Sequence, residues 1–126
     1  MIETKYIQGF EEEGEVFGYS ANKADNRGLR IWEGYFENLL SGCYSEHFQP
    51  GGLMECYCNQ NGFYEESPWK IKNLKVAIND LEGFKADNVE TTIPEMKKTV
   101  LALKDELVSF IKEALENKRE VLIEYN

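Results

Sequence analysis

The order of apolar and polar positions predicts β-structure at the start of the chain. β-forming side chains stand on both sides of the polar run Glu11-Glu12-Glu13-Gly14, at Ile2, Tyr6, Phe10, Val16, Phe17 and Tyr19. Aromatic and β-branched residues on either side of a glycine-containing connection are typical of a hairpin. We therefore expect a hairpin over residues 1–20, followed by a polar, turn-rich loop over residues 22–28.

The segment from Leu29 to Leu40 has two interpretations. Its apolar residues recur at helical spacing and form one stripe: Ile31, Trp32, Tyr35, Phe36, Leu39 and Leu40. Its aromatic content and Gly34 favour a strand instead. We prefer the helix, which would end at Ser41-Gly42, but the pattern leaves both interpretations open.

A second hairpin is expected in the middle of the chain. Pro50, Gly51 and Gly52 break the chain before the apolar run 53–58, which we interpret as a strand. The sequence 59–62, Asn-Gln-Asn-Gly, is typical of a tight turn into Phe63-Tyr64.

The second half of the chain has helical periodicity. A stripe from Ile71 to Leu81 predicts a helix that ends at Gly83, and Ser67-Pro68 either opens this helix or ends the preceding strand. A polar stretch from Lys85 to Thr91 then connects onward.

A longer helix and a strand are expected to close the chain. Thr92 and Glu95 have the spacing of a capping box, and a stripe from Met96 to Ala114 predicts about five helical turns after it. Residues 120–125 are typical of a closing strand. The sequence thus predicts a single α+β domain over residues 1–126, with a small antiparallel or mixed sheet and two or three packed helices.

Composition narrows the functional classes. The 126 residues include 14 Lys+Arg and 23 Asp+Glu, a formal net charge of −9, which disfavours nucleic acid and anionic membranes as partners. We see no apolar run long enough to span a membrane and no signal peptide at the N-terminus, so we expect a cytoplasmic protein.

Cysteine and histidine offer little catalytic or metal-binding chemistry. The odd number of cysteines (Cys43, Cys56 and Cys58) does not suit a secreted disulfide framework, and their spacing with His47 matches no common zinc site. Cys43 and His47 would meet on a helix, but Gly42 and Pro50 make that helix unfavourable. No phosphate-binding glycine motif is present. We expect no cofactor, no metal and no catalytic residue.

The acidic side chains are concentrated in the first half of the chain. Residues 1–66 contain 12 acidic and four basic side chains, a net charge of −8, whereas residues 67–126 have a net charge of −1. The part up to Trp69 also holds 13 of the 16 aromatic residues. Carboxylates beside aromatic anchors suit a basic protein partner. Their negative electrostatic field raises the rate of association, and the aromatic anchors lower the rate of dissociation. The alternative is that the acids only keep a β-rich half soluble while its aromatics form the core.

These features resemble the immunity proteins of bacterial contact-dependent growth inhibition and related polymorphic-toxin systems. The run Gly62-Phe63-Tyr64-Glu65-Glu66-Ser67-Pro68-Trp69 is the local stretch most similar to them, followed by the amphipathic segment 72–81 and a final helix and strand. The resemblance implies a protein that is not an enzyme. It would bind the cognate C-terminal toxin domain of a large secreted effector and block its active site or hold it inactive. Such toxins are commonly nucleases, whose basic grooves suit an acidic surface.

The residues expected to bind the partner are carboxylates on turns or polar faces, together with possible aromatic anchors. They are Glu11, Glu12, Glu13, Glu33, Tyr35, Glu37, Tyr44, Glu46, Tyr64, Glu65, Glu66 and Trp69. Trp69 has a second interpretation as a core residue, because it directly precedes a buried stripe. Two further functions stay open. A nucleic-acid mimic would space its acids along an elongated surface, and a small enzyme or ligand-binding domain would enclose a carboxylate or His47 in a pocket.

Overall fold

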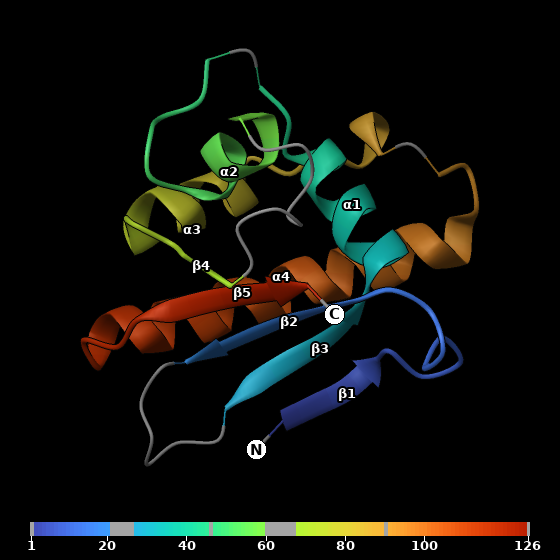
Figure 1. Ribbon diagram of the computed structural model, residues 1–126. Helices are drawn as coiled ribbons and strands as arrows, with labels where there is room; N and C mark the ends of the chain where they lie inside the picture. The colour runs from blue at the N-terminus through green and yellow to red at the C-terminus, as the bar shows by residue number, and fades with distance from the viewer. Residues whose placement is uncertain (1, 21–26, 46, 60–67, 90, 126) are drawn as a thin grey trace.

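The computed structural model describes residues 2–20, 27–45, 47–59, 68–89 and 91–125, which form the predicted α+β domain (Figure 1). The five strands are β1 (Ile2–Tyr6), β2 (Glu15–Ser20), β3 (Gly28–Trp32), β4 (Trp69–Lys70) and β5 (Val121–Tyr125). The described α-helices are α1 (Glu33–Gly42), α2 (Leu53–Asn59), α3 (Leu74–Glu82) and α4 (Pro94–Glu116), with a short 3-10 helix η1 (Ala86–Asn88). The described α-helices thus number four, where the sequence predicted two or three helices.

The sheet is mixed, with the strand order β1-β3-β2-β5-β4. Strand β3 lies between β1 and β2, parallel to β1 and antiparallel to β2. The hairpin expected over residues 1–20 is therefore wrong, although both of its strands exist. The closing strand is confirmed as β5. It lies inside the sheet, because the short strand β4 pairs with its outer side.

Helix α4 lies across one face of the sheet, and the two surfaces enclose the core (Figure 1). Val16, Ile31 and Val121 point into this layer from three neighbouring strands, and each is fully buried. The apolar stripe of α4 that faces this layer is also fully buried, and it consists of Val100, Leu103, Leu107 and Ile111. Helices α1 and α3 pack against α4. None of the described helices covers the opposite face of the sheet (Figure 1).

Residues 29–40 contain both a strand and a helix. Strand β3 ends at Trp32, and α1 begins at Glu33 and ends at Gly42, the end that the sequence predicts. The apparent single stripe arises because Ile31 is buried from the sheet while Phe36 and Leu39 are buried from the helix. Gly34 does not mark a strand. A Cβ there would lie within 2.7 Å of the Trp32 indole, so any larger residue requires the indole to move.

The strand predicted over residues 53–58 is wrong, because Leu53–Asn59 forms helix α2. Its first turn is held from a distant segment, since the Asp80 carboxylate accepts a hydrogen bond of 3.1 Å from the Met54 backbone N–H. Leu53 and Met54 are buried in the core. Met54 and Asp80 are 26 residues apart in the sequence, so the periodicity of residues 53–58 gives no sign of this hydrogen bond. For this reason the segment was predicted as a strand. The partner strand expected at Phe63-Tyr64 lies outside the described residues.

The two C-terminal helices form as predicted but begin differently. Pro68 leads into strand β4, and α3 starts later, where the Asn73 side chain accepts hydrogen bonds from the backbone N–H groups of Lys75 and Val76. The capping box at Thr92 is wrong. Helix α4 is capped by Ile93 without a side-chain bond and opens with Pro94, whose fixed φ suits the first helical position.

Candidate functional site

An acidic and aromatic surface forms at one end of the sheet, where β1 and β3 end and α1 begins (Figure 1). We define this acidic–aromatic surface by eight residues from two stretches of the chain. They are Phe10, Glu11, Glu12, Glu13, Trp32, Glu33, Tyr35 and Glu37. Five of the eight are carboxylates, and the other three are aromatic.

The first stretch is a compact connection between β1 and β2. Successive backbone hydrogen bonds join Phe10 to Ile7 at 2.9 Å and Glu13 to Phe10 at 3.0 Å, and Ile7 is buried beneath them. The Glu11 carboxylate accepts the Gly9 backbone N–H at 3.0 Å. Hydrogen bonds from its own backbone N–H and from Gly9 lower the pKa of Glu11, so this carboxylate is ionised at neutral pH. Glu11, Glu12 and Glu13 are all exposed.

The aromatic part is a stack of two rings. Phe10 lies flat on Trp32, with ring centroids 3.9 Å apart and an angle of 8° between the planes. Tyr35 meets both rings edge-on, at 5.6 Å from Phe10 and 5.0 Å from Trp32. Within the described chain, Phe10 and Trp32 belong neither to the buried core nor to the partly buried side chains that pack on it, whereas Tyr35 does pack on the core. The stack is therefore a separate, partly exposed cluster.

Glu33, at the start of α1, is held from two other segments of the chain. The Glu33 backbone N–H donates to the Gly14 carbonyl at 3.0 Å, and its carboxylate accepts the Tyr125 hydroxyl at 3.2 Å. Partial burial raises the pKa of Tyr125, and the nearby charges of Glu33 and Glu37 raise it further. A side chain at Gly14 would overlap the Glu33 carboxylate and lie 2.8 Å from the Tyr125 hydroxyl, so glycine makes this arrangement possible.

A neutralised ion pair borders this surface. Arg30 donates two hydrogen bonds to the Glu15 carboxylate, of 2.6 and 2.8 Å, from the strand next to it. This two-pronged contact is the strongest geometry for an arginine and a carboxylate. Arg30 is paired with Glu15, and its charge also contributes to the lowered pKa of Glu11.

The structure brings together half of the residues predicted to bind a partner. Glu11, Glu12, Glu13, Glu33, Tyr35 and Glu37 all belong to the acidic–aromatic surface. Tyr44 is 52% exposed but follows the opposite end of α1. Trp69 is buried in the core, where only 6% of its surface is exposed, so its second interpretation as a core residue is confirmed and it is not a surface anchor. Four of the predicted residues lie outside the described part of the chain: Glu46, Tyr64, Glu65 and Glu66.

Phe10 and Trp32 are the residues that pattern reading missed at this surface. The apolar pattern places Phe10 in a hairpin strand and Trp32 in a helical stripe. One local feature distinguishes each of them, because Phe10 directly precedes the run of three glutamates and Trp32 directly precedes Glu33. Aromatic residues are enriched in protein interfaces, so an aromatic residue beside exposed polar positions is an interface candidate as well as a core candidate.

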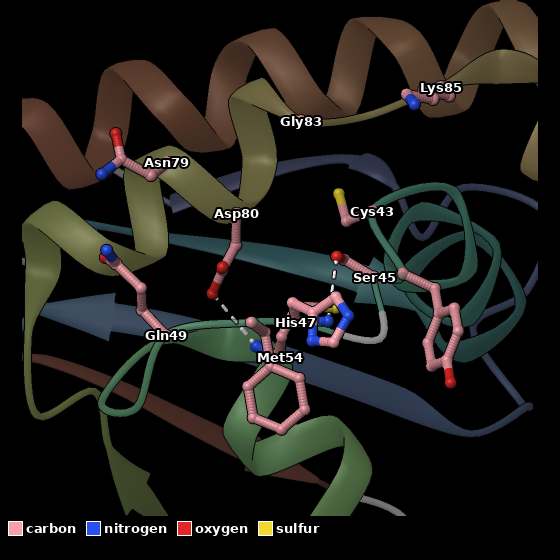
Figure 2. Close-up of a pocket in the computed structure, with 11 residues that line it drawn as sticks. Cys43, Ser45, His47, Gln49, Met54, Asn79, Asp80, Gly83 and Lys85 are labelled. Atoms are coloured by element: carbon pink, nitrogen blue, oxygen red, sulfur yellow. Dashed lines mark hydrogen bonds between the residues drawn. The ribbon is translucent and has the colours of Figure 1, made fainter.

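A second candidate is a pocket of about 410 Å³ beyond the end of α1, in which Cys43, His47 and Asp80 take part (Figure 2). Burial raises the pKa of the Cys43 thiol to about 12, so the thiol is protonated at neutral pH. Figure 2 shows this thiol directed away from the His47 ring, and the two do not form a nucleophile–base pair. Burial also raises the pKa of Asp80, whose carboxylate is bound to the start of α2.

The described residues hold no group of three or more His, Cys, Asp or Glu side chains that could bind a metal ion. In the same part of the chain, no helix combines the length and the apolar character needed to cross a membrane.

Comparison of the chain with protein-family models, with curated proteins and with solved structures finds no match.

Proposed function

We propose that this chain binds a basic protein domain through the acidic–aromatic surface, and that it acts as an immunity protein that neutralises a cognate toxin. The observation that supports this proposal best is the stack of Phe10 on Trp32 outside the core, beside five carboxylates. Large aromatic side chains that lie outside a core are typical of the centre of a protein interface.

The two kinds of side chain have separate roles in such an interface. The five carboxylates create a negative field that steers a basic partner and raises the association rate. Desolvation of the aromatic rings slows dissociation. Because exposed charges are screened by salt, the association rate should fall as ionic strength rises, while the dissociation rate changes less.

A protein partner suits this surface better than a role as a nucleic-acid mimic. A mimic needs carboxylates spaced along an extended surface, like phosphates along a backbone. Here the carboxylates are gathered at one end of a sheet and alternate with aromatic rings. The proposed toxin is a nuclease, because its positively charged substrate groove would present the complementary charge.

Co-purification tests the proposal. We would tag this chain, express it with the reading frame adjacent to it in its native operon, and identify what elutes after a wash at moderate salt. The expected result is a stoichiometric basic partner that is toxic when expressed alone. A chain that elutes alone, with no toxic product encoded beside it, would contradict the proposal.

A matched pair of variants tests the location of the interface. Glu12→Lys changes the acidic–aromatic surface, and Glu116→Lys makes the same change of charge at the far end of α4. We expect Glu12→Lys to lower the association rate with the captured partner by about tenfold and Glu116→Lys to change it less than twofold. Equal effects of the two variants would mean that only net charge matters and that the interface lies elsewhere.

The pocket supports a second candidate function, that of a small-ligand-binding domain. His47 and the half-buried Asp80 line a space large enough for a small molecule. A thermal-shift screen of polar metabolites, followed by Asp80→Asn and His47→Gln variants, tests this candidate. A stabilising compound whose effect both variants abolish would favour it over the immunity function.

A further inference from the structure

The partner's anchoring residue can be inferred from the outer face of the sheet. Because Ile31 of β3 points into the core, the next side chain, Trp32, points to the uncovered face, and the backbone of Gly34 closely approaches its indole. Phe10 covers the indole from the loop after β1. Both rings are partly exposed, and Phe10 is the one that directly adjoins the exposed acidic run 11–13.

Acidic groups adjoin this ring. Glu11 follows Phe10 directly and is held in place by the Gly9 backbone N–H, and Glu12 and Glu13 continue the exposed run. The nearby cation Arg30 is already bound by Glu15 through two hydrogen bonds. An apolar, planar ring beside exposed carboxylates complements a group that is both planar and cationic.

We infer that the partner is anchored here by an arginine side chain, whose guanidinium stacks on Phe10 and donates hydrogen bonds to the neighbouring glutamates. This inference rests on the proposed function and specifies the chemistry of the partner.

Arginine fits better than lysine for two reasons. Its guanidinium is planar and weakly hydrated, so it stacks on a ring at little desolvation cost, and its fixed fork matches a carboxylate. The lysine ammonium is compact and strongly hydrated, and it responds mainly to charge.

Two peptides of equal charge distinguish stacking on the ring from attraction by charge alone. Fluorescently labelled octa-arginine and octa-lysine would be titrated with the full chain at low salt and followed by anisotropy. We expect octa-arginine to bind about five- to tenfold more tightly, in line with one desolvated cation–π contact. Glu116→Gln, at the far end of α4, should weaken both peptides by the same small factor, because it removes charge alone.

Variants of the ring assign the preference to Phe10. Phe10→Leu should reduce the arginine preference to less than twofold and leave octa-lysine affinity unchanged. Phe10→Tyr should retain the preference. Phe17→Leu is the matched control, since Phe17 is another partly exposed aromatic, on strand β2. Phe10 lies outside the core, and a thermal melt of each variant checks that the fold is intact.

The outcomes separate this inference from the proposed function. Equal affinity for the two peptides, binding of neither, or an arginine preference that survives Phe10→Leu would each overturn the arginine anchor. None of these results bears on co-purification with the natural partner. Failure to co-purify a partner, together with a Phe10-dependent arginine preference, would overturn the immunity function and leave the anchor supported.

Discussion

The Tyr125 hydroxyl donates a hydrogen bond to the Glu33 carboxylate at 3.2 Å, and this contact joins the last strand to the first turn of α1. The two residues are 92 positions apart in the sequence. Gly14, in the connection before β2, leaves room for both groups. Three segments of the chain therefore fix the position of one surface carboxylate, which is a requirement for a preorganised binding site.

The Tyr125 phenol should titrate above its ordinary value of 10.0. Replacing Glu33 with Gln removes one of the negative charges that oppose phenolate formation, so the pKa should move back toward the ordinary value. Ultraviolet absorbance of the phenolate, with Tyr125→Phe subtracted as reference, measures this shift. No change in the Glu33→Gln variant would mean that burial alone controls the titration.

The stability of the same contact should depend on pH in the alkaline range. Because the pKa is raised on folding, the folded state holds the phenolic proton more tightly, and this contribution is complete below about pH 10. It is lost as pH rises through the folded pKa. The difference in unfolding free energy between the wild type and Tyr125→Phe, measured by urea unfolding, should therefore shrink at alkaline pH. A difference that stays constant with pH would contradict the raised pKa of Tyr125.

Gly34→Ala should destabilise the protein although it adds a better helix former. In an open helix the change would stabilise by about 1 kcal/mol. Here the new Cβ overlaps the Trp32 indole, and we expect a net loss of about 1–3 kcal/mol. Near-ultraviolet circular dichroism should also lose the signal of the Phe10–Trp32 stack.

Gly18→Ala is the control for this prediction. Its Cβ would meet only Ile123, at an ordinary 3.5 Å, so the aromatic signal should be kept. Stabilisation of the protein by Gly34→Ala would show that the indole moves aside at little cost and that the stack is loosely held.

Asp80→Asn should change how stability depends on pH. The pKa of Asp80 is raised from 3.8 because the carboxylate is partly buried, so folding favours its protonated form. The cost of burying this charge is present at neutral pH and disappears as pH falls through the raised pKa toward about pH 4. The stability of the wild type relative to Asp80→Asn should therefore rise between neutral pH and pH 4.

Urea unfolding at several pH values measures this effect. Asp87→Asn, an exposed change in η1, is the control and should leave the pH profile of the wild type unaltered. A constant difference between the wild type and Asp80→Asn across this range would show that the carboxylate is not desolvated.

Cys43 should resist thiol reagents in the folded protein, because it is buried and its raised pKa keeps the thiol protonated. Cys58 is exposed and should react first. In a Cys56→Ser background, a chromogenic disulfide reagent should modify one thiol in the native state and a second only after unfolding. Two fast modifications at neutral pH would reopen the question of a reactive Cys43.

The helical half of the protein could be predicted in outline. The stripe of α4 is long and regular, and each of its expected core positions from Val100 to Ala114 is buried. Its N-terminal cap was predicted wrongly, because Ile93 stands where the capping box required Thr92. Cap identity depends on where the preceding chain enters the helix, and that path is set by packing.

The first half shows how local pattern fails. The strands at residues 2–6 and 15–20 were recognisable, but their pairing was not, since β3 separates them. Strands that follow one another in the sequence often pair, but not always. Which strands pair depends on how the whole sheet buries its apolar face. The run 53–58 was misassigned for a related reason, because Asp80 stabilises its first helical turn from another segment.

The sequence by itself determined the α+β class, the position of most strands and of the long helix, and the excess of negative charge in the first half. These properties follow from local periodicity and from composition, which folding does not change. Only the tertiary structure decided that Glu11 and Glu33 share one surface, that Phe10 and Trp32 stack outside the core, and that Trp69 lies within it. Each of these facts depends on contacts between distant segments, and such contacts exist only once the sheet and its helices have packed.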